Sequence, residues 1–268
     1  MPELPEVQTI VAGLKKKILN KKIVSLFEER KGTIRNFIRV PTCEFGSISA
    51  ISRRGKYIIF HTSNGYKFVI HLRMTGKMIF EKNLDKKSTH ERAYFIFDDK
   101  TKLIFDDVRA FGKIQIYDIK NRIESLEKLG LEPLSDDFTA EYLRKRFRNR
   151  RSSIKNLLLN QSIVAGLGNI YVCEILYRAK ISPQKKGNEL SIRKLNLIVK
   201  ETKKVLKEAI KYNGTTISDY RSVEDKTGEF QKFLNVYQKK ECPQGHQIKR
   251  IKQVGRSTYY CPVCQKKK

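Results

Sequence analysis

A cluster of three cysteines and one histidine near the C-terminus constrains the fold more than any other feature. Cys261 and Cys264 stand at C-x2-C spacing, and Cys242 and His246 precede them at C-x3-H spacing. Three thiols and one imidazole fill the four positions of a tetrahedral structural zinc site and leave none for water. A module this small needs a metal to fold, so we expect one structural zinc ion. The alternative is a pair of unrelated cysteines.

Two short strand patterns lie between the two pairs of metal ligands. They cover residues 248–253 and 257–260 and meet at Val254-Gly255, which predicts a β-hairpin. Arg256 would then stand at the hairpin tip, where its side chain can reach a phosphate group.

The charge balance of the chain points to a polyanionic partner. Its 268 residues include 56 Lys and Arg against 28 Asp and Glu, a formal net charge of +28. Nucleic acid is the leading candidate, because each cation on a phosphate backbone releases counterions, and an anionic membrane surface is the rival. We see no apolar run long enough to span a bilayer, and the acidic N-terminus is unlike a signal peptide. We therefore expect a cytoplasmic protein that does not bind membranes.

The N-terminal half, residues 1–130, reads as one helix followed by strands. Pro5 suits the first turn of a helix, and an apolar stripe follows it. Residues 56–61 and 66–72 flank an Asn-Gly turn at 63–65, and 94–97 and 103–105 flank a second turn. This pattern predicts an antiparallel β domain, most simply a sandwich. The stripe consists of Val7, Ile10, Val11, Leu14 and Ile18.

The C-terminal half reads as helical up to the metal module. A proline and several turn formers mark a linker at 131–137. Helices are expected at 138–147, after Ser152 or Ser153, at 169–179, and from Ser191 to Tyr212, within a domain covering 138–230. The zinc module takes up 231–268. The fold class is therefore α+β with two domains and a β-hairpin zinc finger.

The N-terminus carries the first candidate for covalent chemistry. Removal of Met1 leaves Pro2 with a secondary amine that can attack an electrophilic carbon and form an iminium. A generic α-amine has a pKa of about 8 against about 10.4 for lysine, so more of it is in the nucleophilic form near neutral pH. Glu3 and Glu6 are nearby proton donors or acceptors. The alternative is that this segment only caps a helix.

Two further segments could contact a nucleic acid. Gly166-Leu167-Gly168-Asn169 opens a helix, where backbone N–H groups can bind a phosphate, and Arg150 and Lys155 lie close to it in sequence. Arg109 and Phe111 place a cation and an aromatic ring two residues apart, a pair that can wedge into a base stack. A plain helix–helix turn and a surface arginine beside a core phenylalanine are the respective alternatives. His71 and Met74, at a strand end, are weaker candidates.

Read in order, these segments resemble the bacterial formamidopyrimidine-DNA glycosylases from end to end. The N-terminal motif and the Arg256 finger are specific to that superfamily, and Leu4-Pro5 and the Asp107 motif favour its oxidised-purine branch. The matching motifs are Met1-Pro2-Glu3-Leu4-Pro5-Glu6-Val7, Arg54-Gly55-Lys56-Tyr57, His71-Leu72-Arg73-Met74-Thr75-Gly76, Asp107-Val108-Arg109-Ala110-Phe111-Gly112, Gly166-Leu167-Gly168-Asn169-Ile170-Tyr171, Gly214-Thr215-Thr216 and Gly255-Arg256-Ser257-Thr258-Tyr259-Tyr260-Cys261.

The resemblance implies an N-terminal β-sandwich and a helix-two-turn-helix domain with a zinc finger, which grip damaged double-stranded DNA. It implies a base excision repair enzyme, a DNA glycosylase and abasic-site lyase for 8-oxoguanine and formamidopyrimidines. Pro2 resembles the nucleophile, Glu3 the acid/base, Lys56 the lysine of β-elimination and Arg256 the arginine of δ-elimination. The loop at 213–229 matches the cover over the extruded base. The implied DNA contacts are His71, His90, Arg109, Arg150 and Asn169, and the implied void-filling side chains are Met74, Arg109 and Phe111.

The finger departs from the family pattern, which has four cysteines; His246 is the expected substitute for the second. Three rival hypotheses stay open: an oxidised-pyrimidine glycosylase of the same superfamily, a non-catalytic damaged-DNA binding protein, and a basic zinc-ribbon protein that binds RNA. The last explains the charge and the finger but leaves the proline terminus without a role. We expect a monomer with no obligate protein partner.

Overall fold

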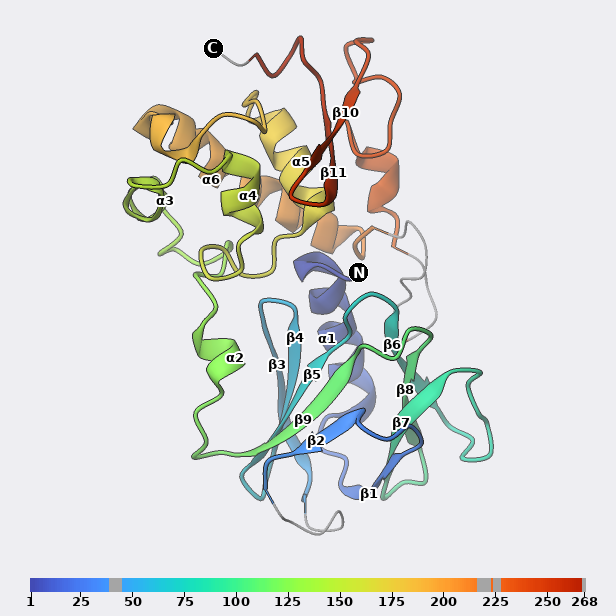
Figure 1. Cartoon of the computed structure of the whole chain (residues 1–268). Helices are drawn as coiled ribbons and strands as arrows, with labels where there is room; N and C mark the ends of the chain where they lie inside the picture. Colours follow the sequence, from blue (N-terminus) through green and yellow to red (C-terminus); the bar gives the residue numbers. More distant parts are fainter. Residues whose placement is uncertain (39–44, 216–222, 224–227, 267–268) are drawn as a thin grey trace. The chain divides into compact units, whose positions relative to one another are not determined.

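The computed structural model describes residues 1–38, 45–215, 223 and 228–266 (Figure 1). The chain forms two compact units, one of Met1–Glu127 with Tyr212–Glu229 and the other of Lys128–Lys211 with Phe230–Lys268. The segment 212–229 thus groups with the N-terminal unit, whereas the sequence placed it in the helical domain. Among the described residues, no helix is long and apolar enough to cross a membrane.

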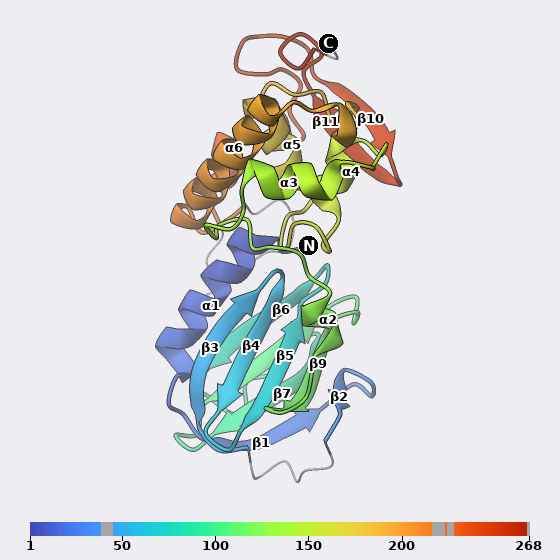
Figure 2. The ribbon, with the colours of Figure 1, turned by 90° about the vertical axis from the view of Figure 1, so that its left-hand side faces the viewer.

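Helix α1, Leu4–Ile18, begins where the sequence predicted it. Glu3 and Glu6 form a reciprocal capping box, and Pro5 stands in the first turn, where its missing N–H leaves no hydrogen bond unmade. The apolar stripe from Val7 to Ile18 is buried. It packs against β3 and β4, beside the sandwich (Figure 2).

The N-terminal unit is a sandwich of two sheets, as predicted. A four-stranded sheet has the order β1-β7-β8-β6, and a five-stranded sheet has the order β2-β9-β5-β4-β3. All pairings are antiparallel except β2 with β9. The strands are β1 Ile23–Glu28, β2 Ile34–Asn36, β3 Ile48–Arg54, β4 Tyr57–Thr62, β5 Tyr66–His71, β6 Gly76–Glu81, β7 Glu91–Phe97, β8 Lys102–Asp107 and β9 Lys113–Asp118.

Aromatic side chains join the two sheets. Phe95 of β7 packs on Phe60 of β4 and Phe68 of β5, with ring centroids 5.9 and 5.4 Å apart. The predicted turns both form: Gly65 takes a left-handed φ of 81° in the β4–β5 hairpin, and Lys100 takes 61° between β7 and β8. A short helix α2, Glu124–Glu127, ends this part of the chain.

The second unit is helical and carries the predicted strand pair. Its helices are α3 Ala140–Phe147, α4 Ile154–Leu159, α5 Asn169–Arg178 and α6 Ile192–Lys211, with short 3-10 turns η1 Gly187–Glu189 and η2 Phe230–Phe233. Thr139 caps α3, so this helix begins two residues later than predicted, and Ser153 rather than Ser152 caps α4. Strands β10 Lys249–Gln253 and β11 Arg256–Tyr260 pair antiparallel, and β11 packs against α5. The predicted α+β fold is confirmed.

Candidate active site and metal centre

The N-terminal residues are held in place by Glu6. Pro2 and Glu3 are buried, and Glu6 is only 2% exposed. One Glu6 carboxylate oxygen accepts the Glu3 backbone N–H at 2.8 Å, and the other accepts the Thr215 N–H at 2.8 Å. Glu6 therefore ties the residue next to Pro2 to the segment after α6, and its oxygens are engaged in structure. The Glu3 side chain in turn accepts the Glu6 backbone N–H, so both carboxylates take part in capping α1.

Lys56 and His71 lie close together at the open end of the β4–β5 hairpin, opposite its turn. Lys56, in the β3–β4 turn, is 6% exposed. Burial, followed by the positive charges of Arg73 and Lys56, lowers the pKa of His71 to about 3. Nδ1 of His71 accepts the Arg73 backbone N–H at 2.9 Å, so the proton of the neutral ring is on Nε2. His71 thus presents a neutral donor.

Met74, Arg109 and Phe111 stand on two loops that are joined to each other. Met74 and Phe111 are 44% and 55% exposed, and the Arg109 guanidinium lies 4.9 Å from the centre of the Phe111 ring. The structure therefore brings the three predicted void-filling residues to neighbouring loops that start at strand ends.

Buried Asp107 organises these loops, and the sequence analysis gave it no role. It accepts the Thr75 hydroxyl and, at 2.8 Å, the Gly112 N–H; Thr75 in turn accepts the Arg109 N–H at 3.1 Å. Ala110 has a left-handed φ of 53°, which costs an L-residue about 1 kcal/mol. The network around Asp107 offsets this strain. The available signal was its place at the head of the Asp107–Gly112 motif.

His90 is held beside Asp106 and Asp107 by hydrogen bonds of its backbone. Its N–H donates to Asp106 at 3.0 Å, and its carbonyl accepts the Asp107 N–H at 3.0 Å. Arg150, in the second unit, is exposed after α3.

The Gly166–Asn169 segment is shaped by Gln161, another residue the sequence analysis missed. Gln161 accepts the Gly166 N–H at 2.9 Å and donates to the Leu167 carbonyl at 2.8 Å. Gly168 is the N-cap of α5, and Asn169 donates from Nδ2 to the Ser257 carbonyl at 2.9 Å. The helix start is therefore fastened to the β-hairpin.

Lys155 is fastened to the same hairpin. It is fully buried, and its ammonium donates to the Thr258 hydroxyl at 2.6 Å and to the Ser257 carbonyl at 3.2 Å. Burial lowers its pKa, nearby Cys173 opposes that shift, and the Arg256 charge adds to it. The ammonium is thus held inside the protein, next to the exposed Arg256 at the hairpin tip.

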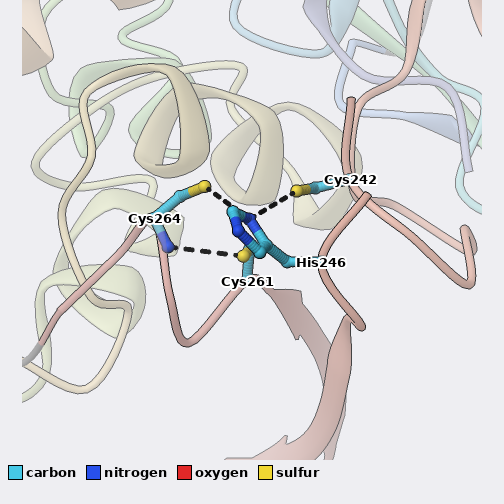
Figure 3. A group of neighbouring side chains, drawn as sticks. All are labelled: Cys242, His246, Cys261 and Cys264. Carbon is cyan, nitrogen blue, oxygen red and sulfur yellow. Dashed lines mark hydrogen bonds between the residues drawn. The ribbon is translucent and has the colours of Figure 1, made fainter. Parts of the chain in front are cut away.

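The predicted metal ligands converge on one point (Figure 3). The ligand atoms of Cys242, His246, Cys261 and Cys264 all lie within 4.8 Å of one another. Gly245, at a left-handed φ of 76°, makes the tight turn that brings His246 back over Cys242. Ligands about 2.0–2.3 Å from a tetrahedral zinc ion are separated by roughly 3.5–4 Å, so this donor set fits one structural zinc.

Comparison with known proteins places all three parts in one family. Models of the formamidopyrimidine-DNA glycosylase N-terminal domain, of its H2TH domain and of the zinc finger found in FPG and IleRS match residues 1–114, 129–221 and 245–267. The formamidopyrimidine-DNA glycosylase of Pelotomaculum thermopropionicum is 38% identical over 280 residues, covering 100% of both chains. The chain belongs to the formamidopyrimidine-DNA glycosylase family.

Solved structures of the Lactococcus lactis glycosylase have the same fold as this glycosylase. A mutant bound to Fapy-dG containing DNA is 37% identical, with a TM-score of 0.92 over 99% of this chain and 100% of that one. The wild-type protein with an oxidised pyrimidine containing DNA is 36% identical, with a TM-score of 0.90 over the same shares. A third structure, with THF containing DNA, has a Gly-His pair in place of one cysteine, and is 36% identical with a TM-score of 0.91 over the same shares.

Two further predictions concern the loop over the extruded base, which came from the resemblance, and the metal, which came from the spacing of its ligands. Most of the 213–229 loop, at 216–222 and 224–227, lies outside the described residues. Zinc is confirmed as the metal of this glycosylase, since the family finger and the Cys/His cluster agree.

The low pKa of His71 gives a prediction for its protonation. In the unfolded chain a histidine takes a proton below about pH 6.5, whereas His71 in the fold stays neutral down to about pH 3. Between these values the unfolded state binds more protons, so the contribution of His71 to stability is complete above pH 6.5 and falls as the pH drops. NMR titration should show no movement of the His71 ring resonances from pH 8 to pH 5. A His71→Gln protein assigns the peaks; a midpoint near 6.5 would contradict the buried, neutral state.

Proposed function

We propose that this protein removes oxidised purines, 8-oxoguanine and formamidopyrimidines, from duplex DNA and then cuts the strand at the abasic site. The observation that carries the proposal is similarity over 99% of the chain to a glycosylase solved with Fapy-dG containing DNA. The charge of +28 supports a DNA partner independently.

Pro2 is the proposed nucleophile. Its nitrogen lone pair forms a bond to C1′ of the damaged nucleotide, and the glycosidic bond breaks. The base leaves with the electron pair of the broken glycosidic bond and takes up a proton. Glu3 protonates the ring oxygen, and the sugar opens to an iminium. The start of α1 at Leu4 supports this role, because it places the positive end of the helix dipole close to Pro2 in sequence.

The iminium then acts as an electron sink for strand cleavage. Loss of the C2′ proton breaks the C3′–O bond in β-elimination, and loss of a second proton breaks the C5′–O bond in δ-elimination. Hydrolysis of the remaining imine frees the Pro2 amine. Lys56 is the proposed lysine of β-elimination near the lesion phosphate, and Arg256 the proposed phosphate contact for the second elimination. The near-complete burial of Lys56 beside His71 supports a role in a dry, preorganised site.

Base extrusion leaves a gap in the duplex that must be filled. Unstacking costs a few kcal/mol, and side chains that occupy the gap offset this cost. The exposure of Met74 and Phe111, and the cation stacked on the Phe111 ring, support the assignment of these residues with Arg109 to that task.

The remaining proposed DNA contacts are of two kinds. His71 and Asn169 are proposed to bind phosphates, and His90, Arg109 and Arg150 to make further contacts with the DNA. Lys155 was predicted to do the same, but its two hydrogen bonds to β11 favour a positioning role, in which it fixes the strand that begins at Arg256. One structural zinc ion holds the finger, and no chemical step passes through it.

Excision of oxidised pyrimidines is a second candidate activity. The Lactococcus lactis glycosylase has been solved with an oxidised pyrimidine containing DNA, so this fold accommodates such lesions. A binding-only role is disfavoured because Pro2 and Glu3 are both present. The expected cytoplasmic location and monomeric state stay predictions.

Borohydride trapping tests the mechanism. Wild-type protein with a duplex carrying one 8-oxoguanine opposite cytosine should give a covalent adduct, and Pro2→Gly should give little or none. Glu3→Gln should slow excision by about 10²–10⁴-fold, the usual contribution of a general acid. Mass spectrometry must first confirm that Met1 is absent.

The outcome separates the candidates. An adduct with an oxidised pyrimidine duplex but none with 8-oxoguanine would overturn the purine assignment. Tight binding with no adduct on either duplex would overturn the proposal that the protein is an enzyme that acts on these lesions.

Salt dependence tests the role of Lys155. Lys155→Met should weaken binding to an uncleavable abasic-analogue duplex and destabilise the protein by about 1–3 kcal/mol, because buried hydrogen-bond groups of Ser257 and Thr258 lose their partner. The slope of log Kd against log salt should not change. Arg150→Met, at an exposed site, should reduce that slope by about one phosphate contact. A reduced slope for Lys155→Met would show that its ammonium binds DNA instead.

A further inference from the structure

The carboxamide of Gln244 lies against the metal ligands. Its Oε1 is 3.6 Å from Sγ of Cys242 and 3.5 Å from Sγ of Cys264, which belongs to the other ligand pair. Tyr177, in the last turn of α5, donates its hydroxyl to the same oxygen. Tyr177 also belongs to the same buried apolar cluster as Cys242. Three segments thus meet at one carboxamide that is not itself a metal ligand.

Helix α5 holds Tyr177 firmly at this point. Tyr177 is 7% exposed and packs in one apolar cluster with Cys173, Val236, Cys242 and Cys261. One helical turn earlier, buried Glu174 accepts the backbone N–H groups of Val236 and Tyr237 at 2.9 Å each. The segment that leads into the finger is therefore fixed to α5, and the Tyr177 hydroxyl has a defined position beside the sulfurs.

Zinc changes what Gln244 must offer. An amide oxygen suits neutral thiols, whose S–H groups donate to it. Zinc binds thiolates, which have no proton and only accept hydrogen bonds. With the metal bound, the oxygen would face two anionic sulfurs. The same carboxamide carries an NH₂ group with two donors, and a half turn of its plane exchanges the oxygen for the nitrogen.

We propose that Gln244 and Tyr177 are positioning residues of the zinc centre: with zinc bound, Gln244 turns its NH₂ group toward the thiolates of Cys242 and Cys264, and the Tyr177 hydroxyl donates to Cys242. Hydrogen bonds to groups that bind a metal commonly change metal affinity by 10–100-fold. These contacts of Tyr177 and Gln244 make zinc retention depend on α5. The first residue of that helix, Asn169, is hydrogen-bonded to the β-hairpin.

The charge around the centre fits this assignment. Three thiolates, one neutral imidazole and Zn²⁺ sum to one negative charge, which N–H and O–H donors spread. A hollow of about 560 Å³ beside the centre is lined by Tyr177, Gln244, Cys264, Lys180, Lys194 and Lys266, among others. Its cations suit a negatively charged centre, and small solutes can approach the Cys264 thiolate through it. Loss of the Gln244 donor therefore affects the sulfur that a competing chelator reaches.

Zinc transfer to a chelating dye tests the proposal without any DNA. The zinc-loaded full-length protein is mixed with excess pyridylazoresorcinol, and the rate of dye–zinc formation is followed. Gln244→Ala should release zinc about 10-fold faster than wild type, by the loss of N–H donors. Gln244→Glu keeps the shape but adds an anion that cannot donate, so it should release zinc faster still. Tyr177→Phe should be several-fold faster, and Tyr259→Phe is the matched control, since Tyr259 lies in β11 with its ring tilted against that of Tyr237, the centroids 5.0 Å apart.

Cobalt(II) in place of zinc gives a readout that packing alone does not move. Without N–H donors the sulfurs are richer in electrons, so the thiolate-to-metal absorption of Gln244→Ala should shift to lower energy. If Gln244→Glu fails to load metal, the zinc release rates of Gln244→Ala and Tyr177→Phe test the proposal. Wild-type release rates in both would overturn the proposal. So would slow release from Gln244→Glu beside fast release from Gln244→Ala, since that ranking means that Gln244 only fills space.

Discussion

The fixing of the hairpin β10–β11 to the helices behind it is the constraint on which the second unit depends. The strand pair is short, and its tip has an unfavourable backbone: Val254, a β-branched residue, has a left-handed φ of 46° and is 81% exposed. Hydrogen bonds from Lys155, Asn169 and Gln253 hold the hairpin along its length. Zinc then fixes its base. An exposed arginine gains a defined position only because these buried contacts fix the strand that follows it.

The N-terminal unit solves the same problem with carboxylates. Asp107 links the loop of Met74 to the loop of Arg109 through Thr75, and Glu6 links the residue after Pro2 to Thr215. In each case one buried acid accepts hydrogen bonds from two segments distant in sequence. Such an acid fixes the backbone on which neighbouring groups stand, Glu3 in one case and the exposed Arg109–Phe111 pair in the other. Preorganisation of this kind is what a site must have to stabilise charge as it develops.

Local signals were predictable from the sequence, and long-range partners were not. The Asn64-Gly65 turn, Pro5 at the start of α1 and the C-x2-C spacing each depend on neighbouring residues, so the sequence alone located them. The parallel pairing of β2 with β9 depends on strands far apart in the chain, and no local pattern reports it. The same limit applied to Gln161, Glu174 and Gln244, because a glutamine or glutamate on a helix or turn is ordinarily a solvated side chain. Lys155 was predicted to contact DNA because a lysine side chain is ordinarily exposed to solvent. Its burial against Thr258 is what indicates another role.

These cases separate two uses of positive charge in one basic chain. A net charge of +28 attracts phosphates wherever the cations are exposed, and salt screens that attraction. A buried ammonium such as that of Lys155 is desolvated, so it contributes only if its hydrogen bonds are complete, and salt barely reaches it. His71 goes further, since burial keeps its ring uncharged and converts it into a directed neutral donor. The abundance of lysine and arginine can therefore explain affinity for a polyanion. The placement of the proposed Pro2 nucleophile must instead come from the few polar groups that the fold has removed from water.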